Sequence, residues 1–421
     1  MEKKFKVGKT FVLGFGFFGV SIIWALYNAY VPIFLKQGFH FSSFIIGIIM
    51  TIDNIFAILL LPYLGAMSDR TRTKLGRRRP YILAGAPFAA VFFILIPYAT
   101  LKQSVFLMMS TIILMNLAMA VFRTPVIALM PDIIPSKFRS QANGIINFMG
   151  GLGALFVYFG GKKLYDANIA YPFIVGGLVM LVASLIVVIF VNEDKPVLNE
   201  SESENSAPIS LKESFKALLD NLSDVIRGEK SLLFVLLAIF FWFIGYNALE
   251  TFFTSYAKFY LHIKASTGAL ILGMFVLSFM VFSLFAGFIG AKKGRRKTIQ
   301  SGLFIVTLIM ISSLFVKNFM AFAILFFIGG FGWALVNVNS LPMVVDMTTL
   351  EKVGGYTGLY YFFSQAANII APPFAGFLID LFGYPALLVF SSVFFILAFL
   401  MMSFVRRGEI IEDEEQYAAS L

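Results

Sequence analysis

The fold is decided by the stretch Gly65-Ala-Met-Ser-Asp69-Arg70-Thr-Arg72-Thr-Lys74-Leu-Gly76-Arg77-Arg78-Arg79-Pro80. This stretch holds six Lys or Arg residues and one Asp, and it separates two apolar runs. Each run is about twenty residues long, which is the length that crosses a lipid bilayer. Short basic loops resist translocation, so this loop is expected on the cytoplasmic side of the membrane. That position sets the direction of every other apolar segment.

The composition is that of a membrane protein. Of 421 residues, 59% are hydrophobic and 13% are charged, whereas soluble domains average about 45–50% and about 25%. The net charge of +10 does not indicate nucleic-acid binding, because the basic residues are unevenly distributed. Segments expected in the cytoplasm hold 25 of the 33 Lys and Arg residues, against seven in the expected outer loops. This bias places both termini in the cytoplasm and makes the lipid bilayer the protein's surroundings.

Twelve apolar segments can be distinguished along the chain. A segment that spans a bilayer must satisfy its own backbone hydrogen bonds, so each is predicted to be a helix. The predicted fold is therefore an all-α membrane protein with 12 transmembrane helices. The predicted spans are 11–35, 43–66, 81–100, 105–130, 141–161, 171–191, 231–257, 266–290, 299–316, 319–345, 355–380 and 386–405.

One long polar segment, 192–230, divides these spans into six and six. We expect an N-terminal six-helix bundle over 1–191, a cytoplasmic central loop over 192–230, and a C-terminal six-helix bundle with a cytoplasmic tail over 231–421. Within the loop, Ser210-x-x-Glu213 is a capping-box signature, and apolar residues follow it at helical spacing up to Ile226. This pattern predicts a short amphipathic helix on the inner membrane surface.

The two halves look like repeats of one unit. Tyr27-Asn28-Ala29 recurs 219 positions later as Tyr246-Asn247-Ala248, and Gly76-Arg77-Arg78 recurs 218 positions later as Gly294-Arg295-Arg296. A near-constant offset of this kind predicts a duplicated six-helix unit. Asp132 precedes Gly144 by twelve residues, and Asp346 precedes Gly358 by the same interval.

Three ionisable residues, Asp53, Arg123 and Glu250, fall inside predicted spans. Each would cost roughly 2.5–3.5 kcal/mol at the bilayer centre, so each should face a cavity or a partner. Asp53 is either a carboxylate that fixes helix packing or a proton-binding group whose protonated form is favoured because little water stabilises its charge. Arg123 could instead snorkel toward the cytoplasm, and Glu250 could be a rim carboxylate near water. All three are candidates for proton coupling.

Amide and aromatic side chains form a second candidate set. Such amides offer the hydrogen-bond donors and acceptors that a sugar needs, and Tyr and Trp rings offer flat apolar surfaces. The alternative is that some of the amides hold helices together. The predicted substrate-binding residues are Tyr27, Asn28, Asn116, Asn147, Tyr246, Asn247, Asn337, Gln365 and Asn368.

The basic loop resembles the cytoplasmic loop between the second and third helices of major facilitator transporters, Gly-x-x-x-Asp-Arg followed by Gly-Arg-Arg. The longer spacing between Arg70 and Gly76 is similar to that of a branch with plant sucrose/proton symporters, their animal relatives and bacterial sugar permeases. The resemblance implies two six-helix halves that rock around a midplane site. It also implies a cytoplasmic gate that comprises Asp69, Arg70, Gly76, Arg77, Arg78 and Asp132.

The segment from Phe122 to Asp132 resembles the end of the fourth helix in the same branch. There the resemblance implies a membrane-embedded Asp nine residues before the Pro, which in this chain is Pro125. That position is Asn116 here, so coupling has either moved, with Asp53 the best substitute, or is absent. The two Asp positions of melibiose-type permeases correspond to Ala57 and Leu61, so that cation site is not expected.

The sequence carries no enzyme signature. It has no Cys, no Walker loop and only two His residues without metal-ligand spacing, so no catalytic residue, cofactor or metal site is expected. We predict a monomeric secondary transporter of a bacterial cytoplasmic membrane that takes up a sugar, such as sucrose or maltose, with protons. The alternatives are an exporter of drugs or metabolites and an uncoupled sugar uniporter. A non-transporting sensor would need a larger soluble domain than the loop and tail provide.

Overall fold

The computed structural model describes residues 7–134, 138–193, 230–347 and 353–407, with isolated positions between 222 and 228. All regular structure in these ranges is helical. Most of the predicted amphipathic helix at 210–226, and the predicted cytoplasmic tail beyond 407, lie outside the described residues.

The helices of the first half follow the predicted spans closely. Each of the six predicted ranges falls on one, two or three consecutive helices. The elements are α1 (Val7–Phe39), α2 (Ser43–Met50), α3 (Ile52–Arg70), α4 (Arg79–Leu101), α5 (Val105–Ile133), α6 (Arg139–Leu155), the π-helix η2 (Phe156–Gly160), α7 (Gly161–Ala167) and α8 (Tyr171–Phe190).

The second half contains one helix for each of its six predicted spans. These helices are α11 (Lys230–Phe259), α12 (Ala265–Lys293), α13 (Arg295–Ser313), α14 (Phe319–Val345), α15 (Val353–Phe382) and α16 (Ala386–Phe404). The predicted all-α membrane fold is thus confirmed, while the cytoplasmic position of the termini stays a prediction.

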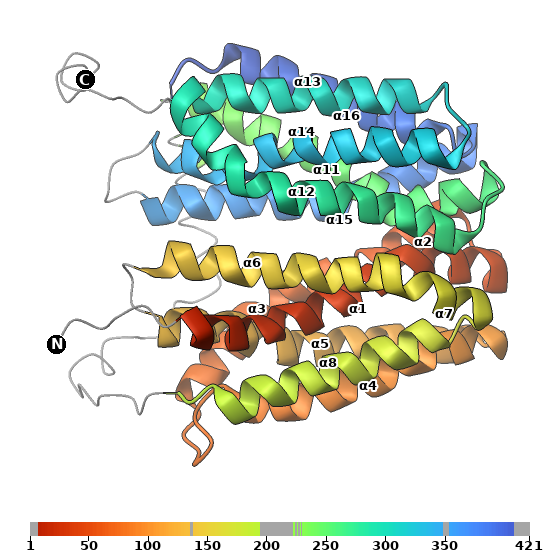
Figure 1. Ribbon diagram of the computed structural model, residues 1–421, viewed down its shortest axis with the longest axis vertical. Coiled ribbons are helices and arrows are strands. Elements are labelled where there is room, and N and C mark those ends of the chain that lie inside the picture. Colours follow the sequence, from red (N-terminus) through yellow and green to blue (C-terminus); the bar gives the residue numbers. More distant parts are fainter. Residues whose placement is uncertain are drawn as a thin grey trace. The chain divides into compact units, whose positions relative to one another are not determined.

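Eleven helical stretches in the described part of the chain are long and apolar enough to cross a membrane. The predicted ninth span is the one that does not qualify by composition. Its helix, α13, has 19 residues and begins with Arg295, Arg296 and Lys297, which lowers the mean hydropathy of so short a segment. It nevertheless packs along α14 and α16 like the other members of its bundle (Figure 1).

The chain forms two compact units. The first comprises Met1–Pro208 with Glu250–Gly273, and the second comprises Ile209–Leu249 with Met274–Leu421. The continuous helices α11 and α12 therefore each contribute residues to both units. The predicted division of the chain at 192–230 into two six-helix domains stays a prediction.

Small residues allow the helices of each unit to approach closely. In the first unit α1 packs against α6 and α8, and a Cβ on Gly153 would lie 2.4 Å from the carbonyl oxygen of Phe18. In the second unit a Cβ on Gly330 would lie 2.2 Å from the carbonyl oxygen of Phe275. Neither position can hold a larger residue without moving a helix backbone, which is typical of helix contacts inside membranes.

Candidate functional site

A break in the second predicted span positions Asp53. The sequence predicts one span at 43–66, but α2 ends at Met50 and α3 begins at Ile52. At the break, the Thr51 hydroxyl donates to the Ile48 carbonyl oxygen at 2.8 Å. Asp53 consequently lies in the first turn of α3, where the unpaired N–H groups of a helix start favour a carboxylate. Its Oδ1 also accepts a hydrogen bond from Asn54 Nδ2 at 2.9 Å.

Arg123 on α5 is an electrostatic partner of Asp53. Helices α3 and α5 pack against each other, and the guanidinium and the carboxylate are close enough to interact electrostatically. Both side chains are half-buried. A charge pair inside a membrane bundle compensates part of the cost of placing each charge there. The structure therefore brings together two of the three ionisable residues that the sequence singles out.

Glu250, the third of these residues, joins the same cluster. It belongs to the first unit although it lies on α11, and its Oε1 accepts a hydrogen bond from Asn28 Nδ2 at 3.1 Å. Glu250 also interacts electrostatically with Asp53. The cluster thus contains two carboxylates and one guanidinium, so full ionisation would leave one uncompensated negative charge among half-buried groups.

Buried polar atoms without partners lie in the same unit. Tyr27 and Asn116 are 1% and 2% exposed. The Tyr27 hydroxyl lies close to Asn116, yet neither this hydroxyl nor either amide atom makes a hydrogen bond of normal geometry with the described residues. A buried polar atom left in this state costs about 1–3 kcal/mol. Such a cost points to water or a ligand as the missing partner.

The π-helical turn η2 could not be predicted from the sequence. It carries Tyr158, which is buried and interacts electrostatically with Glu250. A Cβ on Gly273 of α12 would lie 2.8 Å from the Tyr158 Cβ, so α12 packs directly on this turn. Single π-helical turns occur often at functional sites. No periodicity in the sequence signals the extra residue that such a turn accommodates.

In the second unit, three predicted residues form a chain of amide hydrogen bonds. Asn247 Nδ2 on α11 donates to the Phe243 carbonyl oxygen at 2.7 Å and to Asn368 Oδ1 on α15. Asn368 Nδ2 then donates to Gln365 Oε1 at 2.7 Å. Both donors of Asn247 are thus in use, and the chain joins two helices of the unit.

An aromatic cavity of about 200 Å³ lies in the same unit. The rings of Tyr246 and Trp333 form one wall, stacked with centroids 4.4 Å apart and an angle of 3° between their planes. Asn337 brings an amide to the lining. The remaining lining residues are Phe243, Phe275, Val276 and Phe279. A flat aromatic wall beside an amide is a surface that can accept an apolar ring face together with a hydroxyl group.

Not every amide residue on these helices joins a cluster. Asn147 is exposed on α6, and the described contacts do not bring it into either set. Asn339 is buried and donates to the carbonyl oxygens of Ala286 at 3.1 Å and Leu335 at 2.9 Å. Asn339 therefore holds α14 against α12, as the helix-packing alternative anticipates.

The predicted gate residues form a compact set of ion pairs, which we call the clasp. Arg78 is 4% exposed and pairs with Asp69 at the end of α3. Its Nε also donates to Asp132 near the end of α5 at 2.9 Å, and Arg77 pairs with the other oxygen of Asp132 at 2.8 Å. Arg70 is exposed at the last residue of α3. The clasp thus joins α3, the basic loop and α5.

Glu193 binds the basic loop of the clasp, and the sequence analysis did not identify it as a candidate residue. Its carboxylate accepts hydrogen bonds from the backbone N–H groups of Arg77, Arg78 and Arg79 at 2.7, 2.9 and 3.0 Å. Gly76 adopts φ +105°, and a Cβ there would lie 2.6 Å from the Glu193 carboxyl carbon. The signal that could have found Glu193 is an acidic residue two positions after an apolar run, facing a basic loop.

The second half repeats part of this geometry. Gly294 also has a positive φ, +88°, and the residue after it, Arg295, pairs with Asp346 just beyond the end of α14. Burial raises the pKa of the Asp346 carboxyl above its ordinary value, and Arg295 opposes that shift. The glycine, arginine and aspartate thus occupy matching places in the two halves.

Comparison with known proteins identifies relatives among transporters. The isoprimeverose transporter of Lactiplantibacillus pentosus is 25% identical over 301 residues, which is 68% of this chain and 60% of that protein. The proton-associated sugar transporter A of Homo sapiens is 30% identical over 162 residues, which is 35% of this chain and 21% of that protein. A multi-drug resistance efflux pump PmrA homolog of Lactococcus lactis is 25% identical over 256 residues, covering 58% of this chain and 59% of that protein. The matched part is thus at most about three fifths of each of these relatives.

Solved structures share the fold at low sequence identity. The nucleoside transporter NupG, as its D323A mutant, superposes with a TM-score of 0.73 at 12% identity, covering 94% of this chain and 99% of that one. A bacterial homolog of the human lysosomal transporter Spinster gives the same TM-score at 11% identity, covering 98% of this chain and 100% of that one. The sequence profile described as Major Facilitator Superfamily matches residues 13–264 and 251–419. The chain is therefore a multi-pass membrane protein that belongs to the Major Facilitator Superfamily.

Proposed function

We propose that this protein is a secondary active transporter that takes up a sugar together with protons by alternating access. The observation that carries the proposal is the cluster of Asp53, Arg123 and Glu250 inside the first unit. The cluster holds two carboxylates and one guanidinium, so a proton on either carboxylate removes the uncompensated charge. A carboxylate that gains and loses a proton in this way can couple transport to a proton gradient.

Coupling requires that proton binding and sugar binding influence each other. By linkage, a sugar that favours the protonated cluster is itself bound more tightly when the cluster is protonated. Asp53 is suited to this role because Arg123 is close enough to balance its charge when the proton leaves. Asn28 holds Glu250 in reach of the same cluster. The buried polar atoms of Tyr27 and Asn116, which lack hydrogen-bond partners among the described residues, offer a polar contact for the sugar nearby.

The aromatic cavity of the second unit supports a sugar as the substrate. The stacked rings of Tyr246 and Trp333 offer a flat face for the C–H side of a sugar ring, and Asn337 offers a donor and an acceptor for hydroxyl groups. Two of the relatives are named as transporters of isoprimeverose and of sugar. We infer a di- or oligosaccharide, with sucrose, maltose and isoprimeverose as the first candidates.

A proton gradient is sufficient to drive such uptake. One charge that crosses a potential of 100 mV yields about 2.3 kcal/mol, which corresponds to roughly fifty-fold accumulation of a neutral sugar at one proton per sugar. No nucleotide hydrolysis is needed to account for accumulation of that size.

The test is transport by the purified protein in proteoliposomes. Counterflow with a panel of labelled sugars identifies a substrate, and Asp53→Asn is then compared with the parent chain. The variant is expected to keep counterflow but to lose uphill accumulation and the pH dependence of uptake. Asp380→Asn, which changes an exposed carboxylate on α15, is the matched control and should behave like the parent.

The proposal fails if Asp53→Asn concentrates sugar with the parent's pH dependence. Glu250→Gln is then the second variant, and retained coupling in both would leave an uncoupled uniporter. Counterflow with none of the sugars would favour the exporter reading, which the aromatic lining of the cavity and the match to an efflux pump homolog support. Lipophilic cations added to the panel test that reading directly.

A further inference from the structure

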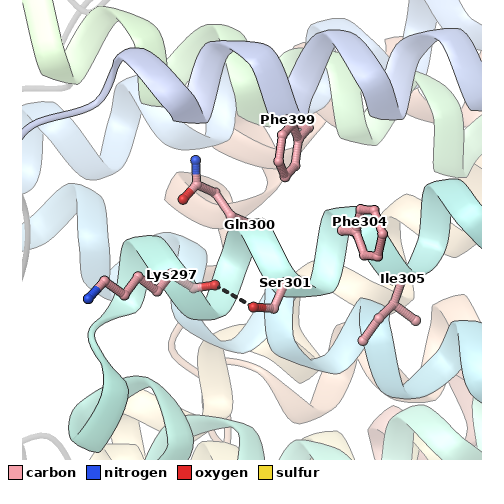
Figure 2. A pocket seen from close by; sticks show the side chains of 6 residues that line it. All are labelled: Lys297, Gln300, Ser301, Phe304, Ile305 and Phe399. Atoms are coloured by element: carbon pink, nitrogen blue, oxygen red, sulfur yellow. Dashed lines mark hydrogen bonds between the residues drawn. The ribbon is translucent and has the colours of Figure 1, made fainter.

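A groove on the second unit lies outside both polar clusters and the clasp. It runs along α13 beside α16, is open along much of its length and has a volume of about 590 Å³. Figure 2 shows Lys297, Gln300 and Ser301 at one end, and Phe304 and Ile305 farther along the same helix. Phe399 reaches toward the groove from α16. The groove is therefore polar at one end and apolar at the other.

The polar end is built from hydrogen bonds that hold two helices in register. Arg296 Nη2 donates to the Ser403 carbonyl oxygen at 2.8 Å, and Gln300 Nε2 donates to the Ser403 hydroxyl at 3.3 Å. Ser301 donates to the carbonyl oxygen of Lys297 at 2.8 Å. These bonds leave the exposed Lys297 side chain at the mouth of the groove.

The charge at this mouth is strongly positive. Five of the six residues in the segment 292–297 are Lys or Arg. One of them, Arg295, is paired with Asp346, and Lys297 is the one that lines the groove. Each Lys or Arg near a bilayer surface attracts anionic lipid by about 1 kcal/mol.

The depth of the groove matches a phospholipid. From Lys297 to Ile305 the helix rises about 12 Å at 1.5 Å per residue, which takes the groove from the interface into the hydrocarbon region. Phe304 is 60% exposed on this path. A phosphate at Lys297 would place an acyl chain against Phe304 and Phe399. We propose that this groove binds an anionic phospholipid of the leaflet that the start of α13 faces.

The chain itself contains a rival occupant. Glu409, Glu412, Asp413, Glu414 and Glu415 follow the last described residue, and this acidic segment could satisfy the same positive charge. To fill the apolar end of the groove, an acidic peptide would have to carry unsatisfied polar backbone groups into the hydrocarbon region, which is strongly unfavourable. A lipid brings an apolar chain and an anionic headgroup in the required order.

A tryptophan reporter tests the proposal. Phe304→Trp in the full chain is reconstituted into vesicles of phosphatidylcholine with increasing brominated phosphatidylglycerol or brominated phosphatidylcholine. We expect the reporter to be quenched with an about five-fold preference for phosphatidylglycerol, which corresponds to one basic contact of about 1 kcal/mol. Adding Lys297→Gln should bring this preference close to one. The parent chain, with its three native Trp residues, supplies the background to subtract.

Phe315→Trp is the matched reporter, because Phe315 is 82% exposed just beyond the C-terminal end of α13. It should show no preference between the two lipids. Equal quenching of the Phe304→Trp reporter by both lipids would overturn the proposal. So would a preference that appears only after the chain is truncated behind Gly408, since the acidic tail would then be the occupant.

A second measurement covers the case in which the reporter variant does not fold. Lipid that remains with the purified parent chain is quantified by mass spectrometry and compared with that of Lys297→Gln and of Lys317→Gln, an exposed lysine beyond the other end of α13. Retained phosphatidylglycerol should fall several-fold with Lys297→Gln alone. Equal retention in all three proteins would refute the groove as its site.

Discussion

Glu193 allows the sharpest test of the clasp. Its carboxylate accepts three backbone hydrogen bonds from Arg77, Arg78 and Arg79, and Glu193→Ala removes both acceptor oxygens and with them all three bonds. Hydrogen bonds to charged groups contribute about 1.5–3 kcal/mol each. The site is only part-buried, so water replaces some of what is lost and each bond is expected to contribute slightly less than the lower value. The expected loss is about 4 kcal/mol of local stability.

This loss should appear in hydrogen–deuterium exchange of the loop. A change of about 4 kcal/mol corresponds to a roughly thousand-fold change in a local opening equilibrium. Peptides that cover residues 76–82 should therefore exchange up to a thousand-fold faster in Glu193→Ala than in the parent chain. Peptides from the middle of α4 should be unchanged, because the helix continues to be held by α5 and α8.

Asn192→Ala is the matched control one residue away. Asn192 accepts only a long hydrogen bond from Arg79 Nη1 at 3.4 Å through its side chain, so its removal should change exchange by less than about ten-fold. Unchanged exchange at 77–79 in Glu193→Ala, with normal membrane insertion, would refute the claim that this carboxylate holds the loop.

Three further predictions follow from other parts of the structure. Gly76→Ala should cost at least about 1–2 kcal/mol from its positive φ and make the basic loop cleavable by trypsin, whereas Gly144→Ala, which has open space around it, should not. Because burial raises the pKa of Asp346, the folded chain binds this proton more tightly than the unfolded chain. Its contribution to thermal stability should therefore grow as pH falls through the raised pKa, and a pH series on Asp346→Asn should lack that contribution. Trp333→Ala should raise the KM for sugar about ten-fold through loss of the stacked wall with little change in turnover, and equal effects of Trp242→Phe, a buried residue outside the cavity lining, would contradict this.

Hydropathy and charge are local properties of the sequence, and they determined the fold. An apolar run of about twenty residues can satisfy its backbone in lipid only as a helix, so the positions of twelve helices could be predicted without any knowledge of their contacts. The same reasoning singled out Asp53, Arg123 and Glu250, because ionisable residues in a span are costly wherever they lie. Gly76 and Gly294, which the repeat offset pairs with each other, both have a positive φ.

Contacts between distant segments were decided by the tertiary structure alone. Asn28 and Glu250 are 222 positions apart, and Glu193 is more than 110 positions from the three N–H groups that it caps. No periodicity encodes such pairs, since each depends on how whole helices are placed. The break at Thr51 also escaped prediction, because apolar residues continue on both sides of it. The sequence thus identified the ionisable and polar residues that are costly to place in a membrane. Only the packing of the helices decided which of these residues interact electrostatically, line the same cavity or form a hydrogen bond with each other.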